Sequence, residues 1–141
     1  MTGSHNNTRV LIVDDDPLTR MMAVEALREG GYSTFEAENG VQALITFNAE
    51  HPDLVLLDVI MPGLSGLEVC RRLRATPAGE LVPVIMLTGL EDSESVEEAF
   101  HVGATDFISK PINWTLLRFR IRYVLRSAQV MKELVRSKDN L

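Results

Sequence analysis

Short apolar runs alternate along the chain with longer segments of helical period. Four runs contain no alternating polar positions, so we expect each to be a strand buried on both faces. They are residues 10–13, 54–57, 84–87 and 107–108. A fifth run, 32–37, mixes polar and apolar residues and is typical of a strand at the edge of a sheet.

Segments with apolar residues at helical spacing follow the runs, over residues 18–28, 64–75 and 93–102. Asn39 and Gln42 are spaced as in a capping box and indicate the start of another helix, and a last helix is expected from Trp114 towards Arg136. Five strand–helix repeats require right-handed crossovers and a parallel sheet covered on both faces. The pattern therefore predicts an α/β fold, a doubly wound five-stranded parallel sheet with strand order 2-1-3-4-5.

Composition fits one globular domain. The chain has 141 residues, 45% of them apolar, and no apolar run approaches the roughly 20 residues needed to cross a membrane. Residues 1–8 are polar and lack a signal core, so we expect a disordered tail or a remnant of cloning. Cys70 is the single cysteine, which excludes an internal disulfide and favours a cytoplasmic location.

Charge is divided unevenly within the net value of −6. Residues 1–117 carry 7 basic and 18 acidic side chains, a net −11, whereas residues 118–141 carry 7 basic and 2 acidic ones, a net +5. The acidic body and the basic end therefore need separate explanations.

Carboxylates gather where a doubly wound sheet binds ligands, at the carboxyl ends of the first and third strands. Asp14, Asp15 and Asp16 follow the first strand, and Asp58 follows the third. Asp16 precedes Pro17 and is typical of a helix N-cap. The other three should lie within a few ångströms, and their mutual repulsion favours an oxygen-ligated Mg²⁺.

Two further polar groups stand at the neighbouring strand ends, since Thr88 ends the fourth strand and Lys110 follows the fifth. A hydroxyl, an ammonium group and a metal ion around one carboxylate would stabilise a phosphoryl group on it. The sequence thus predicts chemistry of phosphoryl transfer.

Four motifs at these strand ends closely resemble those of the receiver domains of two-component response regulators. They are LIVDDD at 11–16, LDVIMPG at 57–63, LTG at 87–89 and SKP at 109–111. The resemblance covers residues 9–126 and implies a flavodoxin-like receiver rather than an enzyme with a separate substrate. Such a receiver promotes its own phosphorylation, by a sensor histidine kinase or phosphotransfer protein, and its own dephosphorylation. Phosphorylation then changes conformation or dimerisation to control an output.

The resemblance also implies roles for single residues. Asp58 matches the phosphoacceptor, and Asp14 and Asp15 match the acidic pair that holds Mg²⁺ together with Asp58. Ile60 matches the residue whose backbone carbonyl completes the protein ligands, which leaves its side chain free to vary.

The conformational switch has counterparts too. Thr88 matches the hydroxyl that bonds a phosphoryl oxygen and moves on activation, and Phe107 matches the aromatic residue that then rotates inward. Lys110 matches the lysine that pairs with the phosphoryl group, and its bond to Pro111 matches a junction usually found as a cis peptide.

Ile60 and Leu90 resemble the residues that flank the path of the water attacking the acyl phosphate. Both are apolar here. We therefore expect slow self-dephosphorylation relative to receivers with polar residues at these positions.

An aspartyl-phosphate hydrolase of the haloacid dehalogenase type is the alternative, with Asp14 as nucleophile in the pair Asp14-x-Asp16. Against it, Leu18 stands where that family prefers Thr or Val, and the chain lacks a cap domain. That alternative also leaves the motif around Asp58 unexplained.

The basic last helix carries an apolar seam with spacings of four and three residues, typical of a coiled coil. The seam residues are Leu117, Ile121, Val124, Ala128, Met131 and Val135. We favour residues 127–141 as a dimeric linker to an output domain outside this sequence, and the junction resembles receivers that precede diguanylate cyclase domains. A solvated helix with cations near its carboxyl end remains open. Nucleic-acid binding is the weakest interpretation, because no base-reading pattern is present.

A homodimer has a charge rationale as well. Acidic side chains at 94, 97, 98 and 106 and basic ones at 118 and 122 would share one face and could pair across a symmetric interface. We expect a dimer through this face, the C-terminal helix, or both, unless these groups pair within one chain.

Overall fold

Five parallel strands form a single sheet in the order β2-β1-β3-β4-β5, which confirms the predicted topology. The structure is a computed structural model and describes residues 8–89 and 93–139. The strands are β1 (Arg9–Val13), β2 (Ser33–Ala37), β3 (Leu54–Asp58), β4 (Val84–Thr88) and β5 (Asp106–Ser109). As predicted, the mixed run becomes an edge strand, β2.

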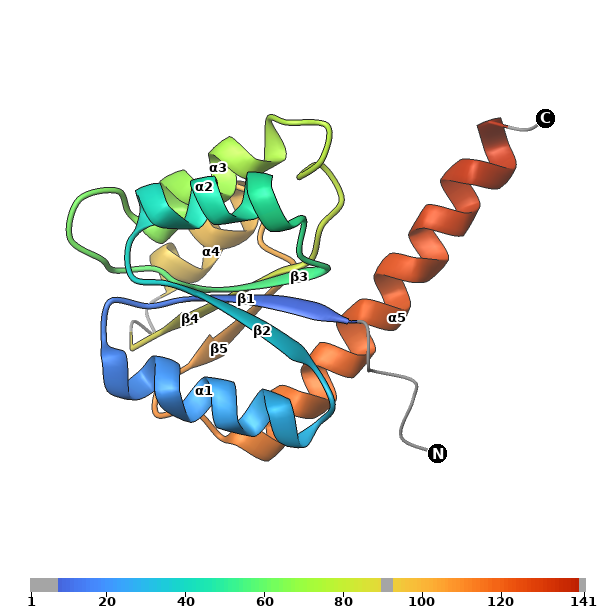
Figure 1. The fold of residues 1–141 in the computed structure, drawn as a ribbon. Coiled ribbons are helices and arrows are strands. Elements are labelled where there is room, and N and C mark those ends of the chain that lie inside the picture. Colours follow the sequence, from blue (N-terminus) through green and yellow to red (C-terminus); the bar gives the residue numbers. More distant parts are fainter. Residues whose placement is uncertain (1–7, 90–92, 140–141) are drawn as a thin grey trace.

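Helices cover both faces of the sheet (Figure 1). They are α1 (Pro17–Glu29), α2 (Gly40–Glu50), α3 (Gly66–Arg74), α4 (Ser93–His101) and α5 (Trp114–Asp139). α1 and α5 lie on one face, and α2, α3 and α4 lie on the other. The winding direction therefore changes between β1 and β3, and their carboxyl ends meet there.

Side-chain caps set several of these helix boundaries. The Asp16 carboxylate accepts from the backbone N–H of Leu18 ahead of α1, and Asn39 accepts from that of Gln42 ahead of α2. α3 begins two residues later than predicted, because the Ser65 hydroxyl accepts from the N–H of Glu68 and thereby caps the helix there.

β1, β3 and β4 are buried on both faces, as their continuous apolar runs predict. The same expectation is wrong for residues 107–108, because β5 is the second edge of the sheet and Phe107 is only partly buried there. Side chains of β1, β3 and β4 alternate between two hydrophobic clusters. One cluster, which includes Leu11, Leu57 and Met86, packs against α2, α3 and α4. The other, which includes Ile12 and Leu56, packs against α1 and α5.

α1 buries a different stripe from the one its sequence suggests. Helical spacing in the sequence predicts that Met22 shares the inner face with Ala26 and Leu27, and this prediction is wrong, because Met22 is 43% exposed. Ala23 takes the inner position instead. Leu18 and Met21 are exposed on the same helix as Met22, so the first turns of α1 carry an apolar outer surface.

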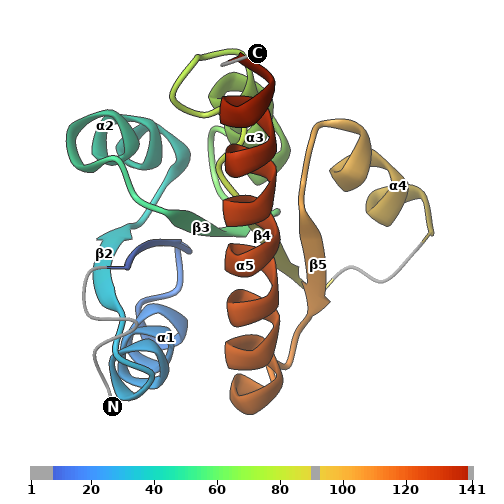
Figure 2. The ribbon, with the colours of Figure 1, turned by 90° about the vertical axis from the view of Figure 1, so that its right-hand side faces the viewer.

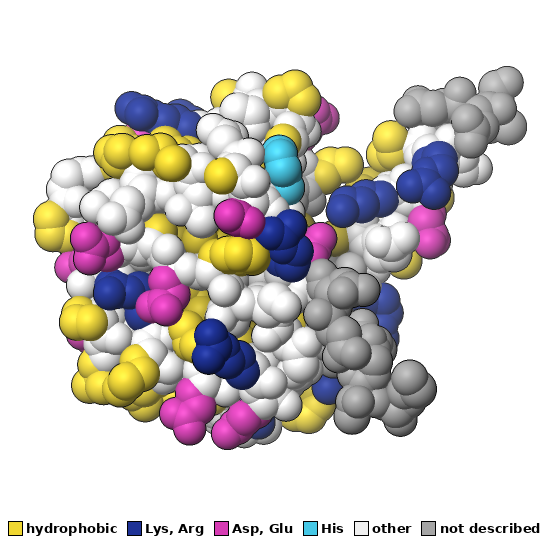
Figure 3. Space-filling model, viewed as in Figure 1, with side chains coloured by type: hydrophobic (Ala, Val, Ile, Leu, Met, Phe, Trp, Pro, Cys, Tyr) yellow, Lys and Arg dark blue, Asp and Glu magenta, His cyan; other side chains and the backbone are white. Residues whose placement is uncertain are grey.

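α5 is one continuous helix (Figure 2), and the burial of its side chains changes along its length. Leu117, Ile121 and Val124 are buried in the core of the domain, whereas residues 129–138 are all exposed. The first half of the apolar seam therefore belongs to the core, and only its second half continues beyond the body. Lys and Arg side chains line this outer part of the helix (Figure 3). No helix in the described ranges is both long and apolar enough to cross a membrane.

Two of the charged groups expected on the dimer face are paired within the chain. Arg120 donates to both carboxylate oxygens of Asp106, at 3.0 and 2.8 Å, and Arg118 lies 3.5 Å from Glu29. The Arg122 guanidinium lies over the Phe119 ring. The side chain of Glu94 lies outside the described residues.

Candidate functional site

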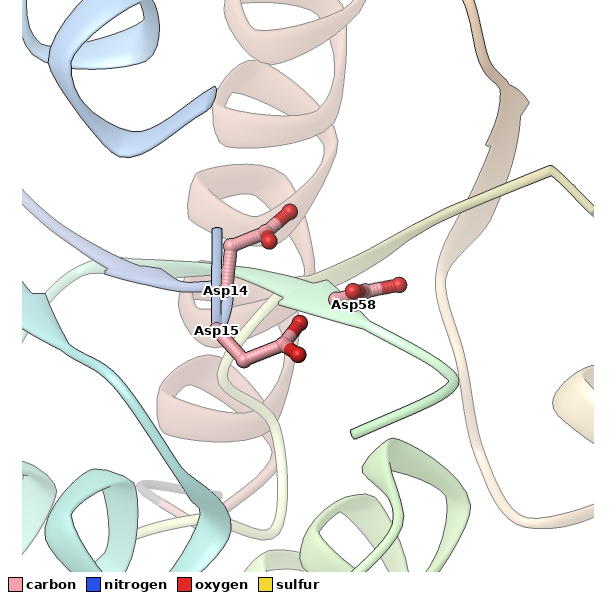
Figure 4. Close-up of side chains that lie close together, drawn as sticks. All are labelled: Asp14, Asp15 and Asp58. Atoms are coloured by element: carbon pink, nitrogen blue, oxygen red, sulfur yellow. The ribbon is translucent and has the colours of Figure 1, made fainter. Parts of the chain in front are cut away.

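Three carboxylates meet at the carboxyl ends of β1 and β3 (Figure 4). Parallel pairing places Val13 opposite Leu57, so the residues that follow them lie side by side. Oxygen atoms of Asp14, Asp15 and Asp58 lie within 4.8 Å of one another. Asp14 and Asp58 are 1% and 5% exposed, whereas Asp15 is open to solvent.

A close backbone approach fixes the segment that carries Asp58. The N–H of Gly66, at the start of α3, donates to the Val59 carbonyl at 2.9 Å. A Cβ atom at position 66 would lie 2.1 Å from the carbonyl oxygen of Asp58. Only glycine allows this approach, which sets the start of α3 directly against the end of β3.

Lys110 provides the one ammonium group that contacts the cluster within the described ranges. Its Nζ lies 3.0 Å from Asp14 Oδ2 and 3.5 Å from Asp58 Oδ2. The backbone N–H of Lys110 donates to the Thr88 carbonyl at 2.7 Å, and the bond between Lys110 and Pro111 is cis. One lysine faces three carboxylates, so the cluster carries excess negative charge.

Burial and crowding of like charges change the ionisation of the site. Burial, followed by the charge of Asp14, raises the pKa of Asp58 to about 6, although Lys110 and the backbone N–H of Ile60 oppose this rise. Burial lowers the pKa of Lys110, but the hydrogen bond to Asp14 and the charge of Asp58 outweigh it, and the net pKa is raised. The lysine is therefore held in its charged form.

The structure also shows the surroundings of three other residues of the predicted site, Thr88, Phe107 and Ile60. Thr88 is buried at the end of β4, beside the pair formed by Asp58 and Leu87. Phe107 is partly buried against the cluster under α2, α3 and α4. The Ile60 side chain is 58% exposed. Leu90 lies outside the described residues.

The donor set fits a small divalent cation. All three carboxylates present oxygen, two of them are buried, and their repulsion is only partly offset by Lys110. Hard cations such as Mg²⁺ prefer such oxygen ligands and retain several waters. Asp16 takes no part, since its carboxylate caps α1 and accepts from the Thr19 hydroxyl at 2.8 Å.

One residue beside the site was missed by the sequence analysis. Arg20, one turn into α1, donates through its guanidinium to the backbone carbonyl of Asp14 at 2.7 Å and to Glu36 on β2 at 3.2 Å. A backbone acceptor leaves no pattern in the sequence, so the arginine alone gave no signal.

Comparison with known proteins agrees with this geometry. The model of the response regulator receiver domain matches residues 10–122. The chain belongs to this family. It is similar to the transcriptional regulatory protein CseB of Streptomyces coelicolor, with 40% identity over 121 residues, covering 86% of this chain and 50% of that protein. A cyclic di-GMP phosphodiesterase of Thermotoga maritima is 41% identical over 118 residues, which cover 84% of this chain and 31% of that protein.

Among solved structures, the chemotaxis protein CheY4 of Vibrio cholerae has the same fold. The TM-score is 0.81 at 31% sequence identity, and the match covers 84% of this chain and 98% of that chain. The chain spans half or less of the length of the two curated relatives named above. The receiver is thus a part shared by larger proteins with different activities. These relationships give no support to the hydrolase alternative.

Proposed function

We propose that this receiver accepts a phosphoryl group on Asp58, from a sensor histidine kinase or a phosphotransfer protein, and that the modification controls an output. The observation that carries the proposal is the buried Asp58 carboxylate, which lies between two further carboxylates and the Lys110 ammonium at the winding switch of the sheet. A buried excess of negative charge is costly in a merely structural role.

In the reaction, a carboxylate oxygen of Asp58 attacks the phosphorus of a phosphohistidine. The new O–P bond replaces the P–N bond, and the imidazole nitrogen leaves with the electron pair and takes up a proton. Asp58 is suited to the attack near neutral pH, because a pKa of about 6 leaves most of it ionised. Lys110 is placed to pair with a phosphoryl oxygen, and Thr88 is assigned the hydroxyl contact that accompanies the switch.

Mg²⁺ would be held by Asp14, Asp15, Asp58 and the backbone carbonyl of Ile60. When bound, it neutralises the charge that gathers on the phosphoryl oxygens. The exposed side of the cluster is open to the donor, since a hollow of about 680 Å³ adjoins Asp15. Leu18, Met21 and Met22 are exposed on α1, which follows Asp15 in the chain, and they offer an apolar surface for the partner protein.

The consequences of phosphorylation are part of the proposal. Movement of Thr88 would draw Phe107 inward, and packing alone must govern this rotation because phenylalanine has no hydroxyl. Slow loss of the phosphoryl group is expected from the apolar Ile60 and Leu90, and decay of the phosphorylated protein within seconds would contradict it. We place the protein in the cytoplasm, where a kinase and its receiver would meet.

Dimerisation through the α4–β5–α5 face, the outer part of α5, or both would connect the switch to an output domain, with a diguanylate cyclase as one candidate. Asp106 and Arg118 have partners within the chain, which leaves the exposed Glu97, Glu98 and Arg122 for contacts across this face. Sedimentation with and without a phosphate mimic tests it, and a monomer under both conditions would contradict it.

The central experiment is mass measurement after incubation with Mg²⁺ and a small-molecule phosphodonor. One phosphoryl group should be added, and it should map to the tryptic fragment that contains Asp58, between Arg28 and Arg71. Asp58→Asn should abolish the addition, whereas the same change at Asp53, at the other end of β3, should not. A phosphoryl group on the fragment with Asp14 would support the hydrolase alternative instead.

A further inference from the structure

Arg20 binds the peptide that joins the two acidic residues of the first strand end. Its side chain is only 15% exposed, and the guanidinium donates through Nη1 to the carbonyl oxygen of Asp14 at 2.7 Å. Nε of the same group donates to Glu36 at 3.2 Å. On the other side of the residue, the N–H of Asp14 donates to the Ala37 carbonyl on β2 at 3.2 Å. The backbone of Asp14 is therefore held at both ends.

The carboxylates of Asp14 and Asp15 are oriented in different ways. Asp14 Oδ1 accepts from the N–H of Asp16 at 2.9 Å, and its Oδ2 accepts from Lys110 at 3.0 Å. The exposed Asp15 carboxylate makes no hydrogen bond within the described part of the chain. Its direction thus depends on its backbone, and the peptide that leads into it is the one bound by Arg20.

We propose that Arg20 is a positioning residue, which aims the Asp15 carboxylate at the metal by holding the peptide between Asp14 and Asp15. Glu36, on β2, accepts the hydrogen bond from Arg20 Nε and thereby fixes the orientation of the guanidinium. The proposal rests on the Mg²⁺ site of the proposed function. Groups that orient metal ligands from outside the ligand set typically affect metal affinity by 10- to 100-fold.

A purely electrostatic role for Arg20 makes the opposite prediction. A cation beside an Mg²⁺ site repels the ion, so removal of the charge alone would tighten binding. Loss of positioning would weaken it. Arg20→Lys separates the two effects, because it keeps the charge and loses the planar fork that reaches two acceptors at once. Arg20→Gln removes both.

The test is a titration of the full chain, labelled with ¹⁵N, with MgCl₂ at constant ionic strength, followed through backbone amide shifts at residues 14–16 and 58–60. Arg20→Lys should bind Mg²⁺ about tenfold more weakly than the wild type. Arg20→Gln should also bind more weakly, by a smaller factor, because loss of the repelling charge offsets part of the effect. Arg28→Gln, on the exposed side of the same helix, is the matched control and should bind within about twofold of wild type.

Wild-type affinity in Arg20→Lys would overturn the proposal, and so would tighter binding by Arg20→Gln. Urea unfolding of each variant shows whether it is folded, and if Arg20→Gln fails to fold, Arg20→Lys decides the matter. A wild-type protein whose amides do not respond to Mg²⁺ would overturn the metal site itself. Weak binding by Asp15→Asn beside normal binding by Arg20→Lys would leave the proposed function intact and remove only this inference.

Discussion

Charged side chains lie within the fold at both ends of the sheet, and the two ends treat them differently. At the amino end of β4 and β5, the Arg74 guanidinium donates to the backbone carbonyls of Gly79, Val82 and Gly103, at 2.8, 2.6 and 3.0 Å. At the carboxyl end, one lysine faces three carboxylates. At the amino end, backbone carbonyls accept hydrogen bonds from the charged Arg74 side chain. At the carboxyl end, the negative charge of the three carboxylates exceeds the positive charge of Lys110.

This difference separates a structural role from a functional one. Arg74 joins the end of α3 to the loops before β4 and β5, and its hydrogen-bond capacity is used by the chain itself. Burial, followed by the charge of Asp14, raises the pKa of Asp58, and the charge of Lys110 offsets this rise only in part. An added cation or phosphoryl chemistry can relieve the excess of negative charge at Asp58, whereas the chain itself already uses four of the five N–H groups of the Arg74 guanidinium.

The largest expected effect on stability comes from removing the Arg74 guanidinium at the amino end of the sheet. Arg74→Met leaves several backbone carbonyls without their donor, and it should lower the free energy of unfolding by about 3 kcal/mol. Arg72→Met is the control, since Arg72 is exposed on the same helix and, among the described residues, forms an ion pair with Glu68 alone, so the loss there should be below about 1 kcal/mol. Urea denaturation at pH 7 measures both, and equal losses would contradict the assignment.

A substitution of Asp58, at the carboxyl end of the sheet, should change the free energy of unfolding in the opposite direction. Asp58→Asn removes a carboxylate that is ionised at a cost, so it should raise the free energy of unfolding at pH 7 by about 2 kcal/mol, and by no more than about 3. The same change at Asp53 should not stabilise, because the Asp53 carboxylate accepts a 2.8 Å hydrogen bond from the Arg9 N–H.

The pH dependence follows from the direction of the Asp58 shift. Between about pH 4 and pH 6 the folded state keeps the Asp58 proton while the unfolded state, with its pKa near 3.8, has lost it. The contribution of Asp58 to stability therefore falls as pH rises through this window. The stability gap between Asp58→Asn and wild type should open from pH 4 to pH 6 and stay constant above, and a gap of constant size throughout would refute the shift.

The smallest effect on stability is expected in the outer part of α5, residues 129–138, where every charged side chain is exposed. A chain that ends after Ala128 loses only exposed residues among those described, and its free energy of unfolding should change by less than about 0.5 kcal/mol. Self-association should weaken in the same protein if the outer helix contributes to a dimer. A large loss of stability, by contrast, would mean that this segment packs against the body.

Several features of the fold were predictable because their causes are local. Buried parallel strands require unbroken apolar runs, and these located β1, β3 and β4 to within one residue at each end. The positions of Asp14 and Asp58 after such runs brought them together once the strand order was known. Asn39 and Ser65 show where this local prediction stops. Each caps the start of a helix, α2 and α3 respectively, but only Asn39 was recognised as a cap from the sequence.

By itself, then, the sequence determined the strand order, the acidic cluster and the lysine that faces it, because each follows from periodicity or from a residue at a strand end. Tertiary structure alone decided how α5 divides its apolar seam, with Val124 in the core and Met131 outside it. It also decided which arginines serve the fold, because Arg20 and Arg74 bind carbonyl oxygens that every residue possesses. Backbone acceptors carry no side-chain signature, and only the folded chain brings them within reach of a particular guanidinium.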